Sequence, residues 1–236
     1  MLAQASAQPI SRRSPRSRLP PAALDDTGRV NLLVTNAVSG RTTGLARTVR
    51  RALKAMRQSR VPYSVIGATA LAVRGLPRMS ADLDIVVLVE DGWRAIQALR
   101  AGGFRPQTPV GSRDEPEPMV VFVDPSTKVE IDLLVAAGDP EATVIDEASS
   151  ARVFGVAAPV ATLEHLLLLY LYSNQPKHLG DFAAIVQSGK ADLARAERSL
   201  AAMHPEMLGE WKRRVAAART PPPAPARPPP RPRRPR

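Results

Sequence analysis

Apolar residues recur at helical spacing early in the central part of the chain. In GLARTVRRALKAMRQS, the apolar positions on one face are Leu45, Val49, Leu53 and Met56. Pro62 cannot continue a helix, so the pattern predicts a helix that ends near Arg60. A short buried strand is expected at 63–66, and a brief helix is expected at 69–74 before Gly75 and Pro77.

The next segments predict a strand followed by a helix and a hairpin. Residues 85–89 are rich in β-branched side chains and predict a central strand. Asp91 is expected to cap a helix that ends at Gly102 and Gly103. Two apolar runs, 119–123 and 129–135, flank the turn-rich segment 124–127 and predict a β-hairpin.

The later part of the chain changes to helical character. After a possible strand at 152–156, helices are expected at 163–172, 179–187 and 191–215. The order indicates an α/β layer over residues 41–157 and a helical C-terminal region over 158–217. The flanking segments, 1–28 and 218–236, read as disordered tails rich in Arg and Pro.

The formal net charge of +11 suggests a nucleic-acid ligand until its distribution is considered. Four of the 33 basic residues lie in 1–20 and nine in 212–236, and neither segment contains an acid. Residues 21–211 therefore hold 20 basic residues against all 22 acidic ones, a net charge of −2. The excess charge belongs to the tails, which leaves RNA or membrane-surface contact by the tails as an alternative to simple solvation.

Composition also limits the class of protein and its compartment. The chain has no cysteine, which excludes disulfides and thiolate metal sites and favours a reducing, cytoplasmic compartment. The longest apolar run, 166–171, is far below the roughly 20 residues that cross a bilayer, so we expect a soluble protein that does not span a membrane. The N-terminal segment lacks the apolar region of an export signal, although a transit peptide has a similar composition.

Carboxylates stand out at one end of the predicted central strand. Asp82 and Asp84 alternate along ADLDIVV, so they share a face about 7 Å apart, and hard cations such as Mg²⁺ prefer such oxygen ligands. Asp132 lies in the second hairpin arm, VEIDLLV, and would join them if that arm pairs beside the Asp84 strand. Three acids around two metals about 4 Å apart form the clamp used for phosphoryl displacement.

Each acid also has a purely structural interpretation. Acids at the start of a strand are commonly solvated, and Asp132 could cap a turn or pair with an arginine. An acid among Ile, Leu and Val is costly unless it is paired or bound to metal, which favours the metal site. Glu130 shares a face with Asp132 and competes as a ligand, although it lies nearer the turn, whereas Asp124 indicates turn chemistry.

Residues before the acids suggest a phosphate site. Gly67, Ala68 and Thr69 lie between a predicted strand and helix, where backbone N–H groups can approach an anion, although a tight turn would also explain the glycine. Arg78 could bind phosphate or merely neutralise Asp82, and Ser80 directly precedes the acids.

IGATALAVRGLPRMSADLDIVV, followed about fifty residues later by VEIDLLV, resembles the polymerase-beta-like nucleotidyltransferase superfamily. The R-x-S-x-D-x-D form is similar to that of minimal nucleotidyltransferases, which include abortive-infection toxins of the AbiEii type. KHLGDFAAI, with Lys177 and Asp181, resembles their C-terminal Lys and Asp motif. The likeness covers roughly residues 61–186 and implies a mixed-sheet nucleotidyltransferase fold with a C-terminal helical cap.

The resemblance also implies a reaction, with Mg²⁺ as cofactor and an NTP such as ATP as substrate. A nucleoside monophosphate would pass to an acceptor hydroxyl or phosphate, on tRNA or protein, in a toxin that has a partner antitoxin. Asp82 and Asp84 would hold two ions, and Asp132 would bind the catalytic ion and help to deprotonate the acceptor. The remaining roles, in nucleotide binding, would fall to Gly67, Ala68, Thr69, Arg78, Ser80 and Lys177.

Three departures from the family pattern support an alternative. Ala68 replaces the preferred Gly or Ser, the run LLLLYLYSN offers Tyr170 and Tyr172 but no lysine, and His178 stands where an acid is common. Thr69 could supply the hydroxyl that Ala68 lacks. A catalytically inactive relative that binds nucleotide, RNA or a partner protein fits these departures. Lys177 could equally be a solvated lysine, and Asp181 an acid in the first turn of a helix.

Overall fold

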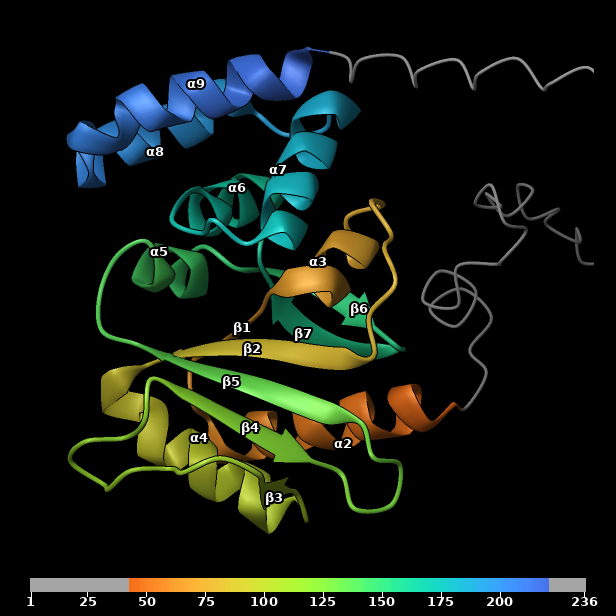
Figure 1. Ribbon diagram of the computed structural model, residues 1–236. Coiled ribbons are helices and arrows are strands. Elements are labelled where there is room, and N and C mark those ends of the chain that lie inside the picture. Colours follow the sequence, from red (N-terminus) through yellow and green to blue (C-terminus); the bar gives the residue numbers. More distant parts are fainter. Residues whose placement is uncertain (1–42, 221–236) are drawn as a thin grey trace, which may run out of the picture.

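The computed structural model describes residues 43–220, and the predicted disorder of 1–28 and 221–236 lies outside this part of the chain. Seven described strands form one mixed sheet in the order β3-β4-β5-β2-β1-β7-β6 (Figure 1). The strands are β1 (Ser64–Val65), β2 (Asp82–Leu88), β3 (Arg105–Pro106), β4 (Met119–Val123), β5 (Glu130–Ala136), β6 (Ser149–Val153) and β7 (Val156–Val160).

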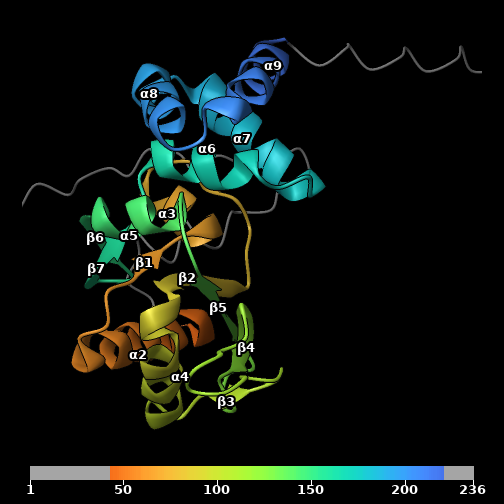
Figure 2. The ribbon, with the colours of Figure 1, turned by 90° about the vertical axis from the view of Figure 1, so that its left-hand side faces the viewer.

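The helices lie on both sides of this sheet and beyond it. They are α2 (Gly44–Ser59), α3 (Gly67–Val73), α4 (Val89–Ala101), α5 (Glu141–Asp146), α6 (Leu163–Leu171), α7 (Pro176–Ser188), α8 (Leu193–Met203), a 3₁₀ turn η1 (Pro205–Met207) and α9 (Leu208–Arg219). Figures 1 and 2 show α2 and α4 under one face of the sheet, α3 and α5 on the other, and α6–α9 as a cap beyond α3 and α5. The predicted class, a mixed-sheet α/β layer followed by a helical cap, is confirmed.

Three predicted elements of the layer are confirmed. Helix α2 ends where Arg60 adopts the left-handed conformation, and the apolar face found in the sequence is fully buried at Val49, Leu53 and Met56. The hairpin β4–β5 is antiparallel. Strand β2 is the central strand, and its parallel pairing with β5 over seven residue pairs brings the two acid-bearing segments side by side.

Two predictions in the layer are wrong in detail. Asp91 does not cap α4, because the helix begins earlier with Leu88 as its N-cap; Asp91 lies in the first turn, 2.6 Å from Arg94. The strand expected at 152–156 is a hairpin of β6 and β7 that turns at Phe154 and Gly155, both with positive φ. Small residues in SSARVFGVAAPV weaken the alternation that would have revealed two strands. Strand β3 and helix α5 were not predicted.

The cap begins as predicted and then diverges. Helix α6 matches the expected 163–172, whereas α7 begins at Pro176 rather than at 179. The single helix expected at 191–215 is wrong, because the chain breaks at Pro205 between α8 and α9. Proline has no N–H for the helical ladder and its ring obstructs the preceding turn. Residues 218 and 219, expected in the tail, belong to α9.

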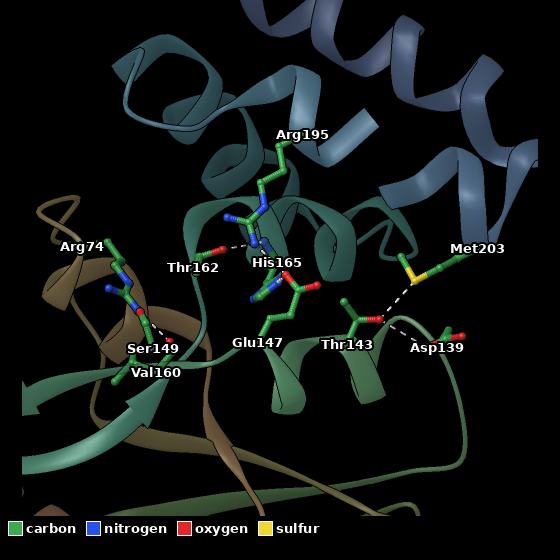
Figure 3. A network of polar contacts seen from close by, with 10 residues as sticks. All are labelled: Arg74, Asp139, Thr143, Glu147, Ser149, Val160, Thr162, His165, Arg195 and Met203. Carbon is green, nitrogen blue, oxygen red and sulfur yellow. Dashed lines mark hydrogen bonds and ion pairs between the residues drawn. The ribbon is translucent and has the colours of Figure 1, made fainter. Parts of the chain in front are cut away.

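A charged junction joins the cap to the layer (Figure 3). The Glu147 carboxylate, just after α5, accepts a 2.7 Å hydrogen bond from Arg195 of α8 and lies 3.3 Å from Nε2 of His165 in α6. His165 is 3% exposed, and burial lowers its pKa below the ordinary value, so the ring is neutral at pH 7. The junction fixes α5, α6 and α8 together. Within residues 43–220, no helix has the length and apolar character needed to traverse a bilayer.

Candidate metal centre and its cleft

Three carboxylates converge at one edge of the two central strands. Strands β2 and β5 pair in register, with Asp84 opposite Asp132 and Asp82 opposite Glu130. Each of the three aspartates offers an oxygen, and these oxygens all lie within 4.8 Å of one another. The alternate residues Leu83, Ile85, Ile131 and Leu133 are fully buried on the opposite face. The period of two in both strands therefore aims the acids together.

The structure distinguishes between the structural and the metal-binding interpretations that the sequence left open for Asp132 and Glu130. Within the described chain Asp132 neither caps a turn nor pairs with an arginine, and no side-chain ion pair satisfies it. Glu130 is exposed and lies outside the converging group, as its place near the turn suggested. An all-carboxylate donor set fits a hard divalent cation such as Mg²⁺.

The acids repel one another. Burial raises the pKa of Asp84 to about 7, and the negative charges of Asp82 and Asp132 act in the same direction. Burial, Asp82 and Glu130 also raise the pKa of Asp132. The positive charge of Lys177 opposes both shifts. Three acids held against their own repulsion, without hydrogen-bond donors to satisfy them all, form a site that favours a cation.

Gly67 makes room for Asp84. The residue begins α3 with φ of 62°, and a Cβ atom there would stand 2.0 Å from Oδ2 and 2.6 Å from Cγ of Asp84. The Ile66 backbone N–H donates to the Asp84 carbonyl at 3.1 Å, which ties the end of β1 to β2. The glycine is required by close approach to a carboxylate as well as by its backbone angle.

The segment between α3 and β2 carries two of the predicted phosphate ligands. The Ser80 hydroxyl donates a short hydrogen bond to Oδ1 of Asp82, which orients that carboxylate. Nε of Arg78 donates to Oδ2 of Asp181 at 2.8 Å, and Nη1 donates to the Met79 carbonyl. Arg78 therefore pairs with Asp181 of the cap and not with Asp82. The guanidinium side chain keeps 30% of its surface exposed.

The helix α7 positions Lys177 and Asp181 differently from the sequence expectation. Because α7 begins at Pro176, Lys177 is in its first turn and Asp181 is in its second. The interpretation of Asp181 as a first-turn acid is wrong. Asp181 is 7% exposed and is satisfied by Arg78, so it couples α7 to the segment that carries Ser80 and Asp82.

A cleft of about 200 Å³ lies between the sheet and the cap. The layer contributes Ile66, Gly67, Asp84, Met119, Asp132, Leu134 and Glu141 to its lining. The cap contributes Leu169, Tyr170, Ser173, Gln175, Lys177 and His178. Of the predicted nucleotide ligands, only Gly67 and Lys177 line the cleft.

Ala68 and Thr69 do not present side chains to this cleft. Their side chains are 0% and 2% exposed, and the Thr69 hydroxyl is buried without a partner among the described residues. A contact between the Thr69 hydroxyl and a nucleotide therefore stays a prediction. Both are in the first turn of α3, whose leading N–H groups have no carbonyl four residues earlier within the helix.

The sequence missed an aromatic wall on the cap side. The Tyr170 ring stacks on His178 with centroids 4.9 Å apart and planes at 19°, and His178 Nδ1 lies 2.7 Å from the Ser173 hydroxyl. Burial lowers the pKa of His178, and Lys177 and Arg78 lower it further, so the ring is neutral at pH 7. These residues come from α6, α7 and their connection, so no local spacing marked them as one wall.

Comparison with known proteins gives no family. No protein-family model matches the chain, and no curated protein matches it. Two solved structures of the antibiotic-resistance factor ANT(2'')-Ia are similar at 16% identity and a TM-score of 0.49; one is a complex with adenylyl-2''-tobramycin. Each covers 73% of this chain, which spans 93% and 99% of theirs.

A third similar structure is that of TM1012, a putative nucleotidyltransferase from Thermotoga maritima. It is 14% identical to this chain, with a TM-score of 0.40. The alignment covers 65% of this chain and 89% of that one. At these levels of similarity no residue role passes from one chain to another. The site of this protein rests on its own geometry.

Proposed function

We propose that this protein is a Mg²⁺-dependent nucleotidyltransferase that transfers a nucleoside monophosphate from an NTP to an acceptor hydroxyl or phosphate. The observation that carries the proposal is the convergence of three carboxylate oxygens, all within 4.8 Å of one another, on two parallel strands. The cleft of about 200 Å³ beside them brings Asp84 and Asp132 together with Gly67 and Lys177. The sequence pattern of the acids gives independent support.

Asp82, Asp84 and Asp132 would hold the metal, with Ser80 fixing the orientation of Asp82. Bound Mg²⁺ would neutralise charge on the phosphates and lower the pKa of the acceptor hydroxyl. The acceptor oxygen forms a bond to the α-phosphorus, the bond from that phosphorus to the bridging oxygen breaks, and pyrophosphate leaves. Asp132, whose pKa is raised by burial and by Asp82, is suited to take the acceptor proton.

The phosphates would be held by groups that surround Gly67 and Lys177. The first-turn N–H groups of Gly67, Ala68 and Thr69 would donate to phosphate oxygens, and Lys177 would supply a positive charge. In this scheme Arg78 reaches phosphate with its terminal nitrogens while Asp181 holds Nε. The pair would position the guanidinium as well as neutralise it.

The test uses two labels on one nucleotide. Wild-type protein is incubated with Mg²⁺, a cell extract and each NTP carrying label at either the α- or the γ-phosphate. We expect the α-label to appear on an acceptor and the γ-label to be released as pyrophosphate. Asp84→Asn should abolish transfer, whereas Glu130→Gln, which removes an exposed acid of the paired strand β5, should leave it unchanged.

Transfer of the γ-label, or equal transfer by Asp84→Asn, contradicts the proposal. Mn²⁺ binding followed by electron paramagnetic resonance gives a readout that does not depend on finding the acceptor. If wild type binds Mn²⁺ no better than Asp84→Asn, the metal centre itself is refuted.

A second candidate is a catalytically inactive relative that binds nucleotide, RNA or a partner protein. Two observations favour it: Arg78 is occupied by Asp181, and the position of Ala68 supplies no hydroxyl. Calorimetry with ATP and Mg²⁺ separates the candidates, because binding without label transfer supports the inactive one. The finer proposal, a toxin acting on tRNA or protein in the cytoplasm and held by an antitoxin, predicts growth arrest on expression that Asp84→Ala relieves.

A further inference from the structure

The outer face of α2 carries positive charge only. Helix α2 has five basic residues among its 16 and no acidic one. We call this set the basic face of α2: Arg47, Arg50, Arg51, Lys54 and Arg57, with Arg60 at the C-cap. At 3.6 residues per turn, the five helical members fall within about a third of the circumference. The opposite side of the helix, at Val49, Leu53 and Met56, is fully buried against the layer.

Protein contacts account for only part of this charge. Nη1 of Arg51 pairs with Asp124 at 2.9 Å, and Nε of Arg50 donates to the Phe154 carbonyl. The side chains of Arg47, Lys54 and Arg57 are exposed and make no ion pair or hydrogen bond to any residue of 43–220. Like charges three and four residues apart weaken a helix, so the arrangement costs stability unless an anion faces it.

The charge of the layer is therefore segregated. Residues 41–157 hold 15 basic and 14 acidic residues, a net charge of +1, yet α2 alone holds five of these cations on one side. At the end of α2, Arg94 of α4 donates to the Ser59 carbonyl, but its charge is paired with Asp91, so the positive surface is that of α2 itself. Figures 1 and 2 show α2 on the side of the sheet away from α3, α5 and the cap, so this surface is separate from the carboxylate cleft.

The residue types on the face select among anionic partners. Among the described residues, the exposed large hydrophobic side chains are Met79, Val89, Met119, Tyr172 and Leu179, and none of them lies in α2. A helix that binds at a membrane surface presents apolar side chains beside its cations. Proteins that hold single-stranded nucleic acid stack bases on aromatic side chains. Neither feature is present here, which leaves a surface suited to a row of phosphates.

We propose that the basic face of α2 binds the phosphate backbone of a double-stranded nucleic acid without reading its sequence. Arginine dominates the face, and a guanidinium can donate two parallel hydrogen bonds to one phosphate. Backbone contact requires no groove-reading side chain and no aromatic group. The surface is a second binding site, and its existence does not depend on transfer chemistry in the cleft.

The test compares two full-length variants that lose the same charge. Arg47→Gln, Lys54→Gln and Arg57→Gln are combined in one variant, and Arg198→Gln, Lys212→Gln and Arg219→Gln of α8 and α9 in the other. Affinity for a short DNA duplex and a short RNA duplex is measured by fluorescence anisotropy over a range of salt. We expect the slope of log K against log salt to be shallower by about two to three in the α2 variant. Each phosphate contact contributes about 0.9 to the steepness of that slope.

The matched variant of α8 and α9 should keep the wild-type slope. A third variant, Arg47→Lys with Arg57→Lys, keeps the charge and should retain most of that slope, and circular dichroism checks that all three fold. Equal slopes in the α2 and the α8 and α9 variants overturn the proposal, because the tails then carry the binding. An α2 variant that loses affinity for phosphatidylserine vesicles and not for the duplexes also overturns it.

Discussion

The aspartate in the β4–β5 turn and the three aspartates of the carboxylate cluster have opposite environments. Asp124, at the turn before β5, is 0% exposed and is surrounded by donors: Oδ1 accepts from the N–H and hydroxyl of Ser126, and Oδ2 accepts from Thr48 and Arg51. Asp132, eight residues further on, faces Asp82 and Asp84. One carboxylate is satisfied by the protein, and the other three are satisfied only if a cation binds.

The pKa of each acid depends on the groups that surround it. Burial alone would raise the pKa of Asp124, but hydrogen bonds from Ser126 and Thr48 and the charge of Arg51 hold it well below the ordinary value. Burial and like charges instead raise the pKa of Asp84 to about 7. A buried acid is therefore not by itself a sign of function. The groups around each acid distinguish the two cases. Asp124 holds α2 against the β4–β5 turn, whereas the cluster acids are placed to bind a ligand.

Removing a carboxylate from the cluster should have the largest effect. Asp132→Asn should lower Mn²⁺ affinity and nucleotidyl transfer by at least about 100-fold, because it removes both a ligand and the group placed to accept a proton. Metal titration and label transfer are measured on the same preparation. Asp124→Asn is the matched change outside the cluster, and equal loss of metal affinity in both variants would remove the distinction between the two environments.

Gly67→Ala tests how tightly the cluster is built. The new methyl group would lie 2.0 Å from Oδ2 of Asp84 and force the carboxylate or the start of α3 to move. We expect metal affinity to fall by at least about tenfold, with a loss of about 2–4 kcal/mol in unfolding free energy. Gly138→Ala, where a Cβ meets no atom within 4 Å, is the control. Unchanged Mn²⁺ affinity in Gly67→Ala would contradict the close approach.

Asp124→Asn should act on stability instead. The amide keeps the shape but loses the charge that pairs with Arg51 and replaces an acceptor by a donor facing Thr48. We expect a loss of about 2–3 kcal/mol in the unfolding free energy at pH 7, measured by urea denaturation. Metal affinity of the folded protein should be unchanged. A weaker Mn²⁺ site with unaltered stability would reverse the assignment.

The pH dependence of stability should have opposite signs at the two sites. The folded-state pKa of Asp84, about 7, exceeds the ordinary value of 3.8, so its contribution is full below pH 3.8 and is lost as the pH rises through 7. Without metal, wild type should lose about 2–3 kcal/mol more than Asp84→Asn between pH 5 and pH 8. The folded pKa of Asp124 is depressed, so its contribution is present above 3.8 and is lost on acidification.

Urea denaturation in EDTA at each pH measures these differences. Added Mg²⁺ should restore the stability of wild type at pH 8 and leave Asp84→Asn unaffected. If Asp84→Asn and wild type change in parallel between pH 5 and pH 8, the carboxylate cluster is not strained in the metal-free protein.

Local pattern was enough for much of the fold. The apolar repeat of α2, the hairpin β4–β5 and the central strand β2 are confirmed, because each is specified within a few residues by periodicity and turn chemistry. The pattern failed where the signal was weak. The small residues around Phe154 concealed the β6–β7 hairpin, and Pro205 divided a stretch read as one helix.

The alternation of side chains along a strand predicts from the residues alone that Asp82 and Asp84 share a face. Three other features of the site come from long-range packing. Strand β5 lies parallel to β2 with Asp132 opposite Asp84, Arg78 pairs with Asp181, and Tyr170 and His178 form one wall of the cleft. Strand order and the docking of the cap depend on contacts between residues far apart in the chain, and no local periodicity records them. The period of a strand fixes the direction of each side chain, whereas the packing of distant segments fixes which residues lie next to it.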